Sequence, residues 1–192
     1  SSPSWSETLT MDDLVQRNNL YYKKFTDVPY TGEISGFENG TFRKGKKNGE
    51  WLKFDRNGQL IRKSNFQDGK LQGLYERYHE NGQLDIKGNY KDGKLDGLWV
   101  YYYENGQLQT KGNFKDDKQV GLWEFYNLDG SLETKGNYKD GKKQGLWELY
   151  YTNGQLMTKE TYKDGKKEGL WEVFYQNGQL DTKGNWKDGK LD

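Results

Sequence analysis

Apolar and aromatic side chains recur in this chain with a period of 24 residues and no insertion or deletion. One unit, residues 97–120, reads GLWVYYYENGQLQTKGNFKDDKQV, and six such units fill residues 49–192. The opening glycines are Gly49, Gly73, Gly97, Gly121, Gly145 and Gly169. A fixed period of this size is typical of stacked arrays, in which each unit buries its apolar face against its neighbours. The pattern favours a binding or structural protein over an enzyme.

Two turns divide each unit into two strands of alternating polarity. The first turn is Asn57-Gly58, Asn81-Gly82, Asn105-Gly106, Asp129-Gly130, Asn153-Gly154 and Asn177-Gly178. The second is Asp68-Gly69, Asp92-Gly93, Asp140-Gly141, Asp164-Gly165 and Asp188-Gly189. These dipeptides tolerate the positive φ that two-residue type I′ hairpin turns need. We therefore predict an all-β fold, an elongated single-sheet antiparallel meander of 24-residue β-hairpin repeats.

The register follows if Asn105-Gly106 is a two-residue loop, which sets Trp99 opposite Gly112 and Val100 opposite Lys111. An aromatic side chain then covers a glycine at Trp123–Gly136 and at Trp171–Gly184. The same arithmetic predicts the opposite-charge pairs Glu76–Lys87, Glu124–Lys135, Glu148–Lys159 and Glu172–Lys183. Each such pair contributes about 0.2–1 kcal/mol.

Strand alternation sorts the side chains onto two faces. The predicted core face carries a Trp column, Trp51, Trp99, Trp123, Trp147 and Trp171 with Tyr75, and a Leu column, Leu60, Leu84, Leu108, Leu132, Leu156 and Leu180. The other face carries the Glu–Lys pairs and a second aromatic column, Phe54, Tyr78, Tyr102, Tyr126, Tyr150 and Phe174.

The domain organisation follows from where the repeat begins. Residues 1–31 form an N-terminal tether and a capping hairpin over Leu14–Lys23, preceded by a helical turn at Thr10. Residues 32–48 form a shortened first repeat with turns at Asn39-Gly40 and Lys44-Gly45, and residues 49–192 form six 24-residue hairpin repeats. Asp117 replaces a turn glycine, so we expect a local bulge there.

Composition narrows the chemistry. Charged residues make up 31% of the chain and hydrophobic residues 31%, but the 16% aromatic residues supply enough buried area for an ordered, thin core. The formal net charge of +1, with acids and lysines interleaved, does not indicate nucleic-acid binding. The longest apolar run, about six residues, is far below a transmembrane span.

No catalytic or metal constellation can be assembled. The chain has no cysteine and one histidine, His79, at a repeat position otherwise filled by Tyr, Asn and Asp. The aspartates fall in turns, where they favour local hydrogen bonds. We expect no enzyme activity, no metal and no cofactor.

The motif Gly-Leu-Trp-x-x-Tyr-Tyr-x-Asn-Gly-x-Leu, followed by Lys-Gly-x-Tyr-Lys-Asp-Gly-Lys, resembles the MORN repeat in its bacterial variant form, especially the YwqK-type antitoxin family. The resemblance covers residues 28–192. It implies an elongated, curved antiparallel sheet and a role in protein–protein scaffolding or, in some eukaryotic cases, at membrane lipids.

Our first functional hypothesis is a non-enzymatic repeat scaffold that binds a partner protein, since Tyr-rich surfaces favour interfaces. The alternatives are a self-assembling structural or surface protein that pairs through open sheet edges, and an antitoxin-like binder of a cognate protein. Glycan and lipid binding stay open. The candidate binding face is Phe54, Tyr78, Tyr102, Tyr126, Tyr150, Phe174, Glu124, Lys135, Glu148 and Lys159.

The two ends bear on localisation and assembly. Ser1-Ser2-Pro3-Ser4 fits a polar tether left by export or lipid anchoring, and equally a simple cut, so both a surface and a cytoplasmic location stay open. The chain stops at Asp192, where another repeat would begin, which leaves a continuing chain or a pairing edge as alternatives.

Overall fold

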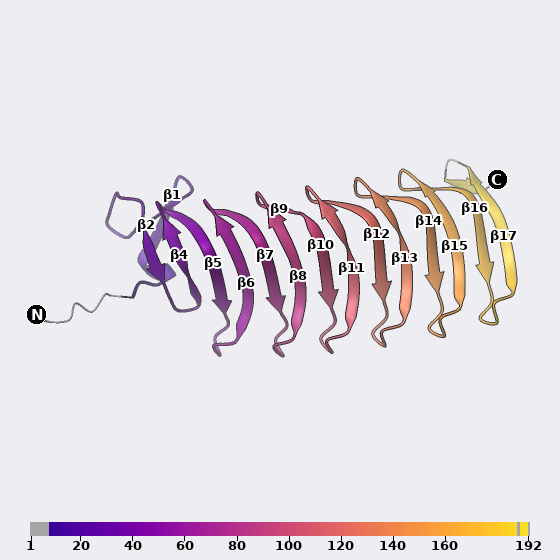
Figure 1. The fold of residues 1–192 in the computed structure, drawn as a ribbon, viewed down its shortest axis with the longest axis horizontal. Helices are drawn as coiled ribbons and strands as arrows, with labels where there is room; N and C mark the ends of the chain where they lie inside the picture. The colour runs from indigo at the N-terminus through magenta and orange to yellow at the C-terminus, as the bar shows by residue number, and fades with distance from the viewer. Residues whose placement is uncertain (1–7, 188, 192) are drawn as a thin grey trace, which may run out of the picture. The chain divides into compact units, whose positions relative to one another are not determined.

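The computed structural model describes residues 8–187 and 189–191. The predicted tether Ser1–Ser4, the turn residue Asp188 and the terminal Asp192 lie outside the described residues. The fold prediction is confirmed, because β-strands and one turn of 3-10 helix make up the elements, and β3 to β18 form one antiparallel sheet of repeated hairpins (Figure 1).

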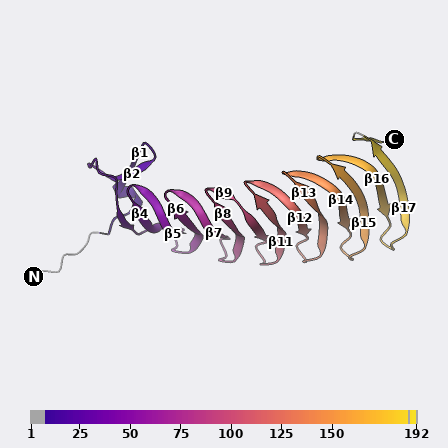
Figure 2. The ribbon, with the colours of Figure 1, turned by 45° about the horizontal axis from the view of Figure 1, so that its top comes forward.

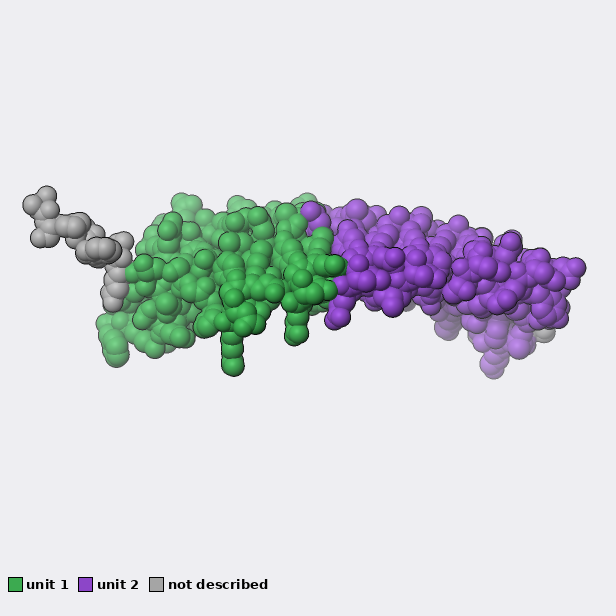
Figure 3. Space-filling model, turned by 90° about the horizontal axis from the view of Figure 1, so that it is seen from below, with its two compact units in different colours: residues 1–84, 89–93 green, residues 85–88, 94–192 purple. Residues whose placement is uncertain are grey.

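The chain divides into two compact units, residues 1–84 with 89–93 (unit 1) and residues 85–88 with 94–192 (unit 2) (Figure 3). Unit 1 contains η1 (Met11–Asp13), β1 (Leu14–Arg17), β2 (Leu20–Lys23), β3 (Gly32–Ile34), β4 (Glu38–Arg43), β5 (Lys46–Phe54), β6 (Leu60–Gln67) and β7 (Lys70–Tyr78). β8 (Leu84–Lys91) contributes residues to both units.

Unit 2 continues the hairpins, whose strands Figure 2 shows from a second direction. Its strands are β9 (Lys94–Leu95), β10 (Gly97–Tyr102), β11 (Leu108–Lys115), β12 (Lys118–Tyr126), β13 (Leu132–Lys139), β14 (Lys142–Tyr150), β15 (Leu156–Lys163), β16 (Lys166–Phe174), β17 (Leu180–Lys187) and β18 (Lys190–Leu191). From β10 to β18 sequence neighbours pair in antiparallel register, whereas β9 and β10 both pair with β8.

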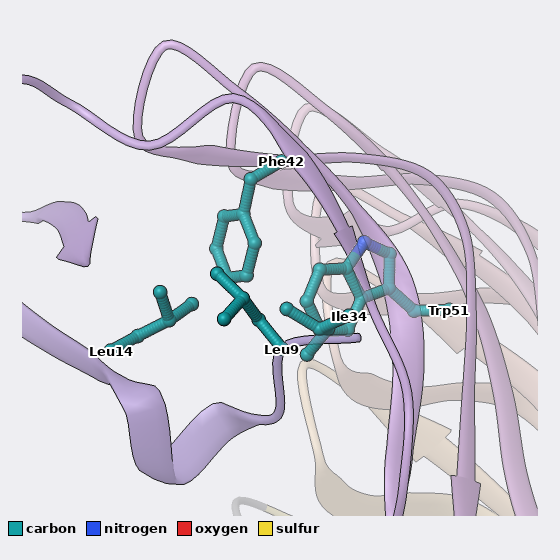
Figure 4. Close-up of a cluster of buried hydrophobic side chains, with 5 residues drawn as sticks. All are labelled: Leu9, Leu14, Ile34, Phe42 and Trp51. Carbon is teal, nitrogen blue, oxygen red and sulfur yellow. The ribbon is translucent and has the colours of Figure 1, made fainter. Parts of the chain in front are cut away.

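The N-terminal part of unit 1 forms as predicted. Thr10 caps η1, with its backbone N–H donating to the Asp13 carboxylate at 2.8 Å. β1 and β2 pair through a turn at Asn18 and Asn19, whose φ values are 49° and 62°. Leu9, Leu14, Ile34, Phe42 and Trp51 converge in a buried cluster (Figure 4). This cluster gives unit 1 a compact apolar core.

The Asn-Gly loops differ from the prediction. The Tyr103 N–H donates to the Gln107 carbonyl at 2.8 Å, the Gly106 N–H donates to the Tyr103 carbonyl at 2.8 Å, and the positive φ (83°) falls on Gly106. These bonds define a three-residue loop, a type I turn followed by a glycine bulge, instead of a two-residue type I′ turn. The longer loop alone would shift the register by one residue.

A bulge in the next strand offsets that shift. Tyr102 lies opposite Leu108, whereas Tyr101 lies opposite Thr110, so Gln109 is an extra residue. Beyond it, the predicted partners Trp99–Gly112 and Val100–Lys111 are in place. The bulge also puts the Leu column opposite the second aromatic column, so its predicted place beside the Trp column is wrong.

The second turns form as predicted. Asp140 and Gly141 have φ values of 51° and 80°, and Lys139 lies opposite Lys142, as a two-residue type I′ turn requires. The bulge expected at Asp117 is wrong, because Asp117 adopts a φ of 67° and keeps the turn. Its carboxylate also accepts the Leu95 N–H at 2.8 Å, which stabilises the neighbouring turn region.

The predicted turn at Asn39-Gly40 is wrong as well, because both residues lie inside β4. A Cβ on Gly40 would come within 2.3 Å of the Trp51 ring, so the glycine is needed for packing instead of for a turn. The turn at Lys44-Gly45 forms as predicted, with φ values of 50° and 75°.

Four tryptophan rings, those of Trp51, Trp99, Trp123 and Trp147, each pack against a glycine of the preceding repeat. A Cβ on Gly112 would lie 2.1 Å from the Trp123 ring, and one on Gly136 would lie 2.2 Å from the Trp147 ring. The Trp123 indole N–H then donates to the carbonyl of Asn113 at 3.3 Å. The prediction that Trp123 covers Gly136 is therefore wrong, although those two residues are paired in the register.

Two positions test this arrangement naturally. Where the ring is smaller, at Tyr75, the opposite residue is the buried Ser64. Where Glu160 replaces the glycine, Trp171 lies instead against Gly184, with the indole nitrogen 2.7 Å from a Cβ built there. The Trp171 indole nitrogen is buried and finds no hydrogen-bond partner within the described part of the chain. Ring size and backbone space are matched between adjacent repeats.

We predict that Gly112→Ala destabilises the protein by about 1–3 kcal/mol, because the new methyl overlaps the Trp123 ring. Urea unfolding followed by tryptophan fluorescence measures the loss. Ser64→Ala, at the equivalent repeat position, is the control and should cost less, since that site already holds a side chain. Equal effects at the two positions would contradict the packing account.

Candidate protein-binding face

The second aromatic column of unit 2 lies on the face opposite the Trp column. Tyr126 follows Trp123 by three residues along β12, so strand alternation turns the two rings to opposite sides. We call this surface the Tyr face and define it in unit 2 by Tyr102, Tyr126, Tyr150 and Phe174. Phe54 and Tyr78 hold the same repeat positions in unit 1.

A lysine, a glutamate and an aromatic ring form a repeated group on this face. The Lys111 ammonium lies 2.8 Å from the Glu124 carboxylate and 5.7 Å from the centre of the Tyr126 ring. Lys111 and Glu124 are directly opposite on β11 and β12, and Tyr126 lies two residues beyond Glu124. The register therefore brings all three groups together without a special loop.

The next group repeats this geometry with an added hydrogen bond. The Lys135 ammonium lies 3.1 Å from Glu148 and 5.5 Å from the centre of the Tyr150 ring. The Tyr150 hydroxyl donates to the Glu148 carboxylate at 2.9 Å. Each polar group thereby meets a charge or a ring of complementary character.

The third group is looser. The Lys159 ammonium lies 4.0 Å from Glu172 and 5.8 Å from the centre of the Phe174 ring. Phe174 has no hydroxyl to donate to the carboxylate, so the group loses the hydrogen bond that Tyr150 makes. The same backbone positions thus give a graded set of contacts along unit 2.

These ion pairs differ from the predicted ones. Glu124 is opposite Lys135 and Glu148 is opposite Lys159, as the register predicted. The close contact of Lys135, however, is with Glu148, which lies opposite it on the following strand. The Tyr150 ring on that side adds a cation–π attraction to this contact. The ion pairs therefore link successive repeats.

Electrostatics fixes the charges of this face. Hydrogen bonds with Tyr150 and Glu148 raise the pKa of Lys135. Partial burial acts to raise the pKa of Glu148, but hydrogen bonds from Lys135 and Tyr150 outweigh it and lower that pKa. Both groups therefore stay charged near neutral pH, and neither is tuned for proton transfer there. The arrangement suits recognition.

A column of exposed leucines on this face was missed by the sequence reasoning. In each Gly-Leu-Trp motif of unit 2 the leucine directly precedes the tryptophan of the Trp face, so it turns to the Tyr face. These side chains are 48–51% exposed: Leu98, Leu122, Leu146 and Leu170. The alternation of the motif was the signal that could have revealed them, because an apolar residue beside a core tryptophan must point away from the core.

Unit 1 shows a weaker version of the same surface. The Tyr78 hydroxyl donates to the Glu76 carboxylate at 3.1 Å, and burial, with Glu76, raises the pKa of Tyr78. Phe54 lines a groove of about 600 Å³ together with Met11 and the exposed Phe37. Phe54 and Tyr78 of unit 1 therefore have different neighbours from one another: Phe54 lines a groove, and Tyr78 is hydrogen-bonded to Glu76.

The remaining candidates have structural roles or none. The backbone N–H of His79 donates to the backbone carbonyl of Gln83 at 2.8 Å, as part of a hairpin loop. Within residues 8–187 and 189–191 no group of three His, Asp or Glu side chains is placed to hold a metal ion. The same residues contain no helix with the length and apolar character of a membrane span.

The fold and the repeated side-chain groups define a β-hairpin repeat protein in which each repeat contacts its neighbours. The sequence matches the MORN repeat variant family over residues 47–68, 71–92, 95–116, 119–140, 143–164 and 167–188. The protein belongs to this family.

No curated protein matches the sequence. Among solved structures, a chain from "Crystal Structure of TarM" aligns with 15% identity and a TM-score of 0.29. The alignment covers 71% of this chain and spans only 20% of that chain. A likeness of this strength carries no argument about function.

We predict a pH-dependent contribution from the Lys135–Glu148 pair. The Glu148 pKa is lowered by folding, so its stabilisation is present above 4.5 and is lost as pH falls through the folded value. The Lys135 pKa is raised, so its stabilisation is present below 10.5 and is lost as pH rises through the folded value. Glu148→Gln should therefore lower the thermal midpoint between about pH 5 and pH 10, and the difference from wild type should disappear as the pH falls through the lowered folded pKa of Glu148.

The control is Glu133→Gln, which removes an exposed carboxylate from the neighbouring strand. Its thermal midpoint should follow that of wild type across the whole range. A Glu148→Gln deficit that persists unchanged at pH 3 would contradict the ion-pair account.

Proposed function

We propose that the protein is a non-enzymatic repeat scaffold that binds a partner protein through the Tyr face of unit 2. One observation carries the proposal. Four half-exposed leucines, from Leu98 to Leu170, run beside four aromatic rings and a line of ion pairs. Exposed apolar groups that recur on one face, rimmed by polar residues, are typical of interaction sites.

The composition of the face fits a protein partner. Tyrosine and other aromatic residues are enriched at protein interfaces, where they bury large areas at a low cost in conformational entropy. The charged groups between them already compensate one another, as at Lys111–Glu124 and Lys135–Glu148. A partner can therefore cover the leucines without leaving an isolated charge buried.

The same pairing disfavours anionic polymers and membranes. Binding to phosphate backbones or acidic lipids draws on lysines whose charge is uncompensated. On the Tyr face Lys111, Lys135 and Lys159 each contact a glutamate. The surface offers an apolar stripe with neutral surroundings, which suits a protein surface of mixed character.

The family resemblance suggests a narrower form of this proposal, a bacterial antitoxin-like scaffold whose partner is one cognate toxin. This form of the proposal predicts a complex of one partner chain with one copy of this protein, and that stoichiometry can be measured. A self-pairing structural protein is the other form, and it predicts that the partner is a second copy of this chain.

The test uses Leu122→Ser with Leu146→Ser in one variant, which shortens the leucine column at its centre. Cross-linking and affinity capture from the natural cells, read by mass spectrometry, should recover a partner with wild type and at least tenfold less of it with the variant. Both leucines are 48% exposed, so the thermal midpoint should change little.

The matched control is Leu128→Ser, which removes a leucine that is 60% exposed but lies in a hairpin loop outside the column. It should retain the partner at the wild-type level. Equal capture by the double variant would contradict the proposal, and recovery of this chain alone would favour the self-pairing form. Tyr102→Ser with Tyr126→Ser tests the aromatic column in the same assay.

A further inference from the structure

The Trp face of unit 1 departs from the repeat pattern in one row of positions. In unit 2 the residues of this row, which are paired strand to strand, are uncharged: Tyr101, Thr110, Phe125, Thr134, Leu149, Thr158, Val173 and Thr182. In unit 1 the row contains Lys53 opposite Arg62, and Arg62 opposite Arg77. Three adjacent cations therefore replace aromatic, aliphatic and threonine side chains.

This row has a cost for folding. Like charges that face each other across neighbouring strands destabilise a sheet. Glu38 lies 3.5 Å from the Lys53 ammonium, but the same carboxylate lies 3.0 Å from Lys47, so one acid is shared by two lysines. The repeat offers threonine as an alternative at the Arg62 position. The arginine therefore points to a role other than folding.

The row forms one wall of a groove of about 710 Å³ in unit 1, which Ile61 and Tyr75 also line. Residues of two hairpin loops, Asp55, Asn57, Gln59 and Glu80, also line the groove. The Gln59 side-chain amide donates to the carbonyl oxygens of His79 at 3.2 Å and Glu80 at 2.9 Å. These bonds hold the groove in shape, as a small-molecule site requires.

We propose that this groove binds a small molecule that carries a phosphate monoester, with Arg62 as the central contact and Lys53 and Arg77 on either side. The guanidinium group presents parallel N–H donors that match phosphate oxygens. A phosphate monoester carries a charge of about −1.5 to −2 near neutral pH, so it relieves repulsion among several cations at once. The Tyr75 ring supplies a surface for the organic part of the ligand.

The lining favours a small molecule over a membrane. Asp55 and Glu80 also line the groove, and a flat anionic bilayer would have to approach both. The Asp55 carboxylate is engaged by the N–H groups of Asn57 and Gln59, at 2.8 and 2.9 Å. The volume also falls in the range of roughly 300–1,000 Å³ that is usual for small-molecule sites.

Arg62→Thr is the sharpest variant, because threonine occupies the matching position in later repeats. The later residues are Thr110, Thr134, Thr158 and Thr182. The variant should keep the fold, and its thermal midpoint should equal or exceed that of wild type, because one of three facing cations is removed. A gain in stability together with a loss of binding is a result that a purely structural arginine would not give.

The experiment titrates the full chain with phenyl phosphate, and separately with inorganic phosphate, at constant ionic strength, followed by backbone NMR shifts. Wild type should shift at Lys53, Arg62, Tyr75 and Arg77, with phenyl phosphate bound more tightly than inorganic phosphate. Arg62→Thr should weaken binding at least tenfold. Lys139→Gln, which removes an exposed positive charge from β13, should bind as wild type does.

Three results would overturn the proposal. The first is equal binding by Arg62→Thr and wild type, and the second is the absence of shifts in the groove with either phosphate. The third is binding only to phosphatidic acid vesicles or only to a phosphoserine peptide, which would assign the cations to a lipid or a protein ligand instead.

Discussion

The packing of a tryptophan ring into the space above a glycine of the preceding repeat is the constraint on which this protein depends. A single sheet has no second layer to cover its apolar face, so each repeat must use its neighbour. The ring of Trp123 takes the place of the missing Cβ on Gly112, and its indole N–H donates to the adjacent backbone. The contact combines apolar burial with a satisfied polar group, and it recurs at intervals of 24 residues.

This constraint separates the two faces by function. The Trp face of unit 2 is committed to packing between repeats, and its rows of threonine and apolar residues are uncharged. The Tyr face does not take part in this packing between tryptophan and glycine. Its lysines and glutamates form ion pairs with one another, and its leucines stay half exposed. At Arg62 and Arg77, where the row of threonine and apolar positions carries charge instead, the protein also has a groove. Recognition is therefore expected on the leucine column and at this break in the pattern.

The sequence predicted the hairpins, the repeat and the Trp–Gly register, because glycine turns and strand alternation are local signals. The predicted register was right, but the two-residue loop assumed for it was wrong. A three-residue loop at Asn105-Gly106 and a bulge at Gln109 offset each other. Which neighbour each side chain contacts could not be predicted. Lys135 lies opposite a glutamate on both sides, and its ammonium contacts Glu148 and the Tyr150 ring. The loop type likewise hid the true face of the Leu column.

The most direct test of the account is a double-mutant cycle at one contact between repeats, with Gly136→Ser, Trp147→Tyr and both changes together. The protein itself contains this combination as Ser64 opposite Tyr75. Size matching predicts that Gly136→Ser alone is strongly destabilising, and that the smaller ring rescues it with a favourable coupling of at least about 1 kcal/mol in urea unfolding. Effects that add to within about 0.5 kcal/mol would contradict the claim that ring and glycine form one packing unit.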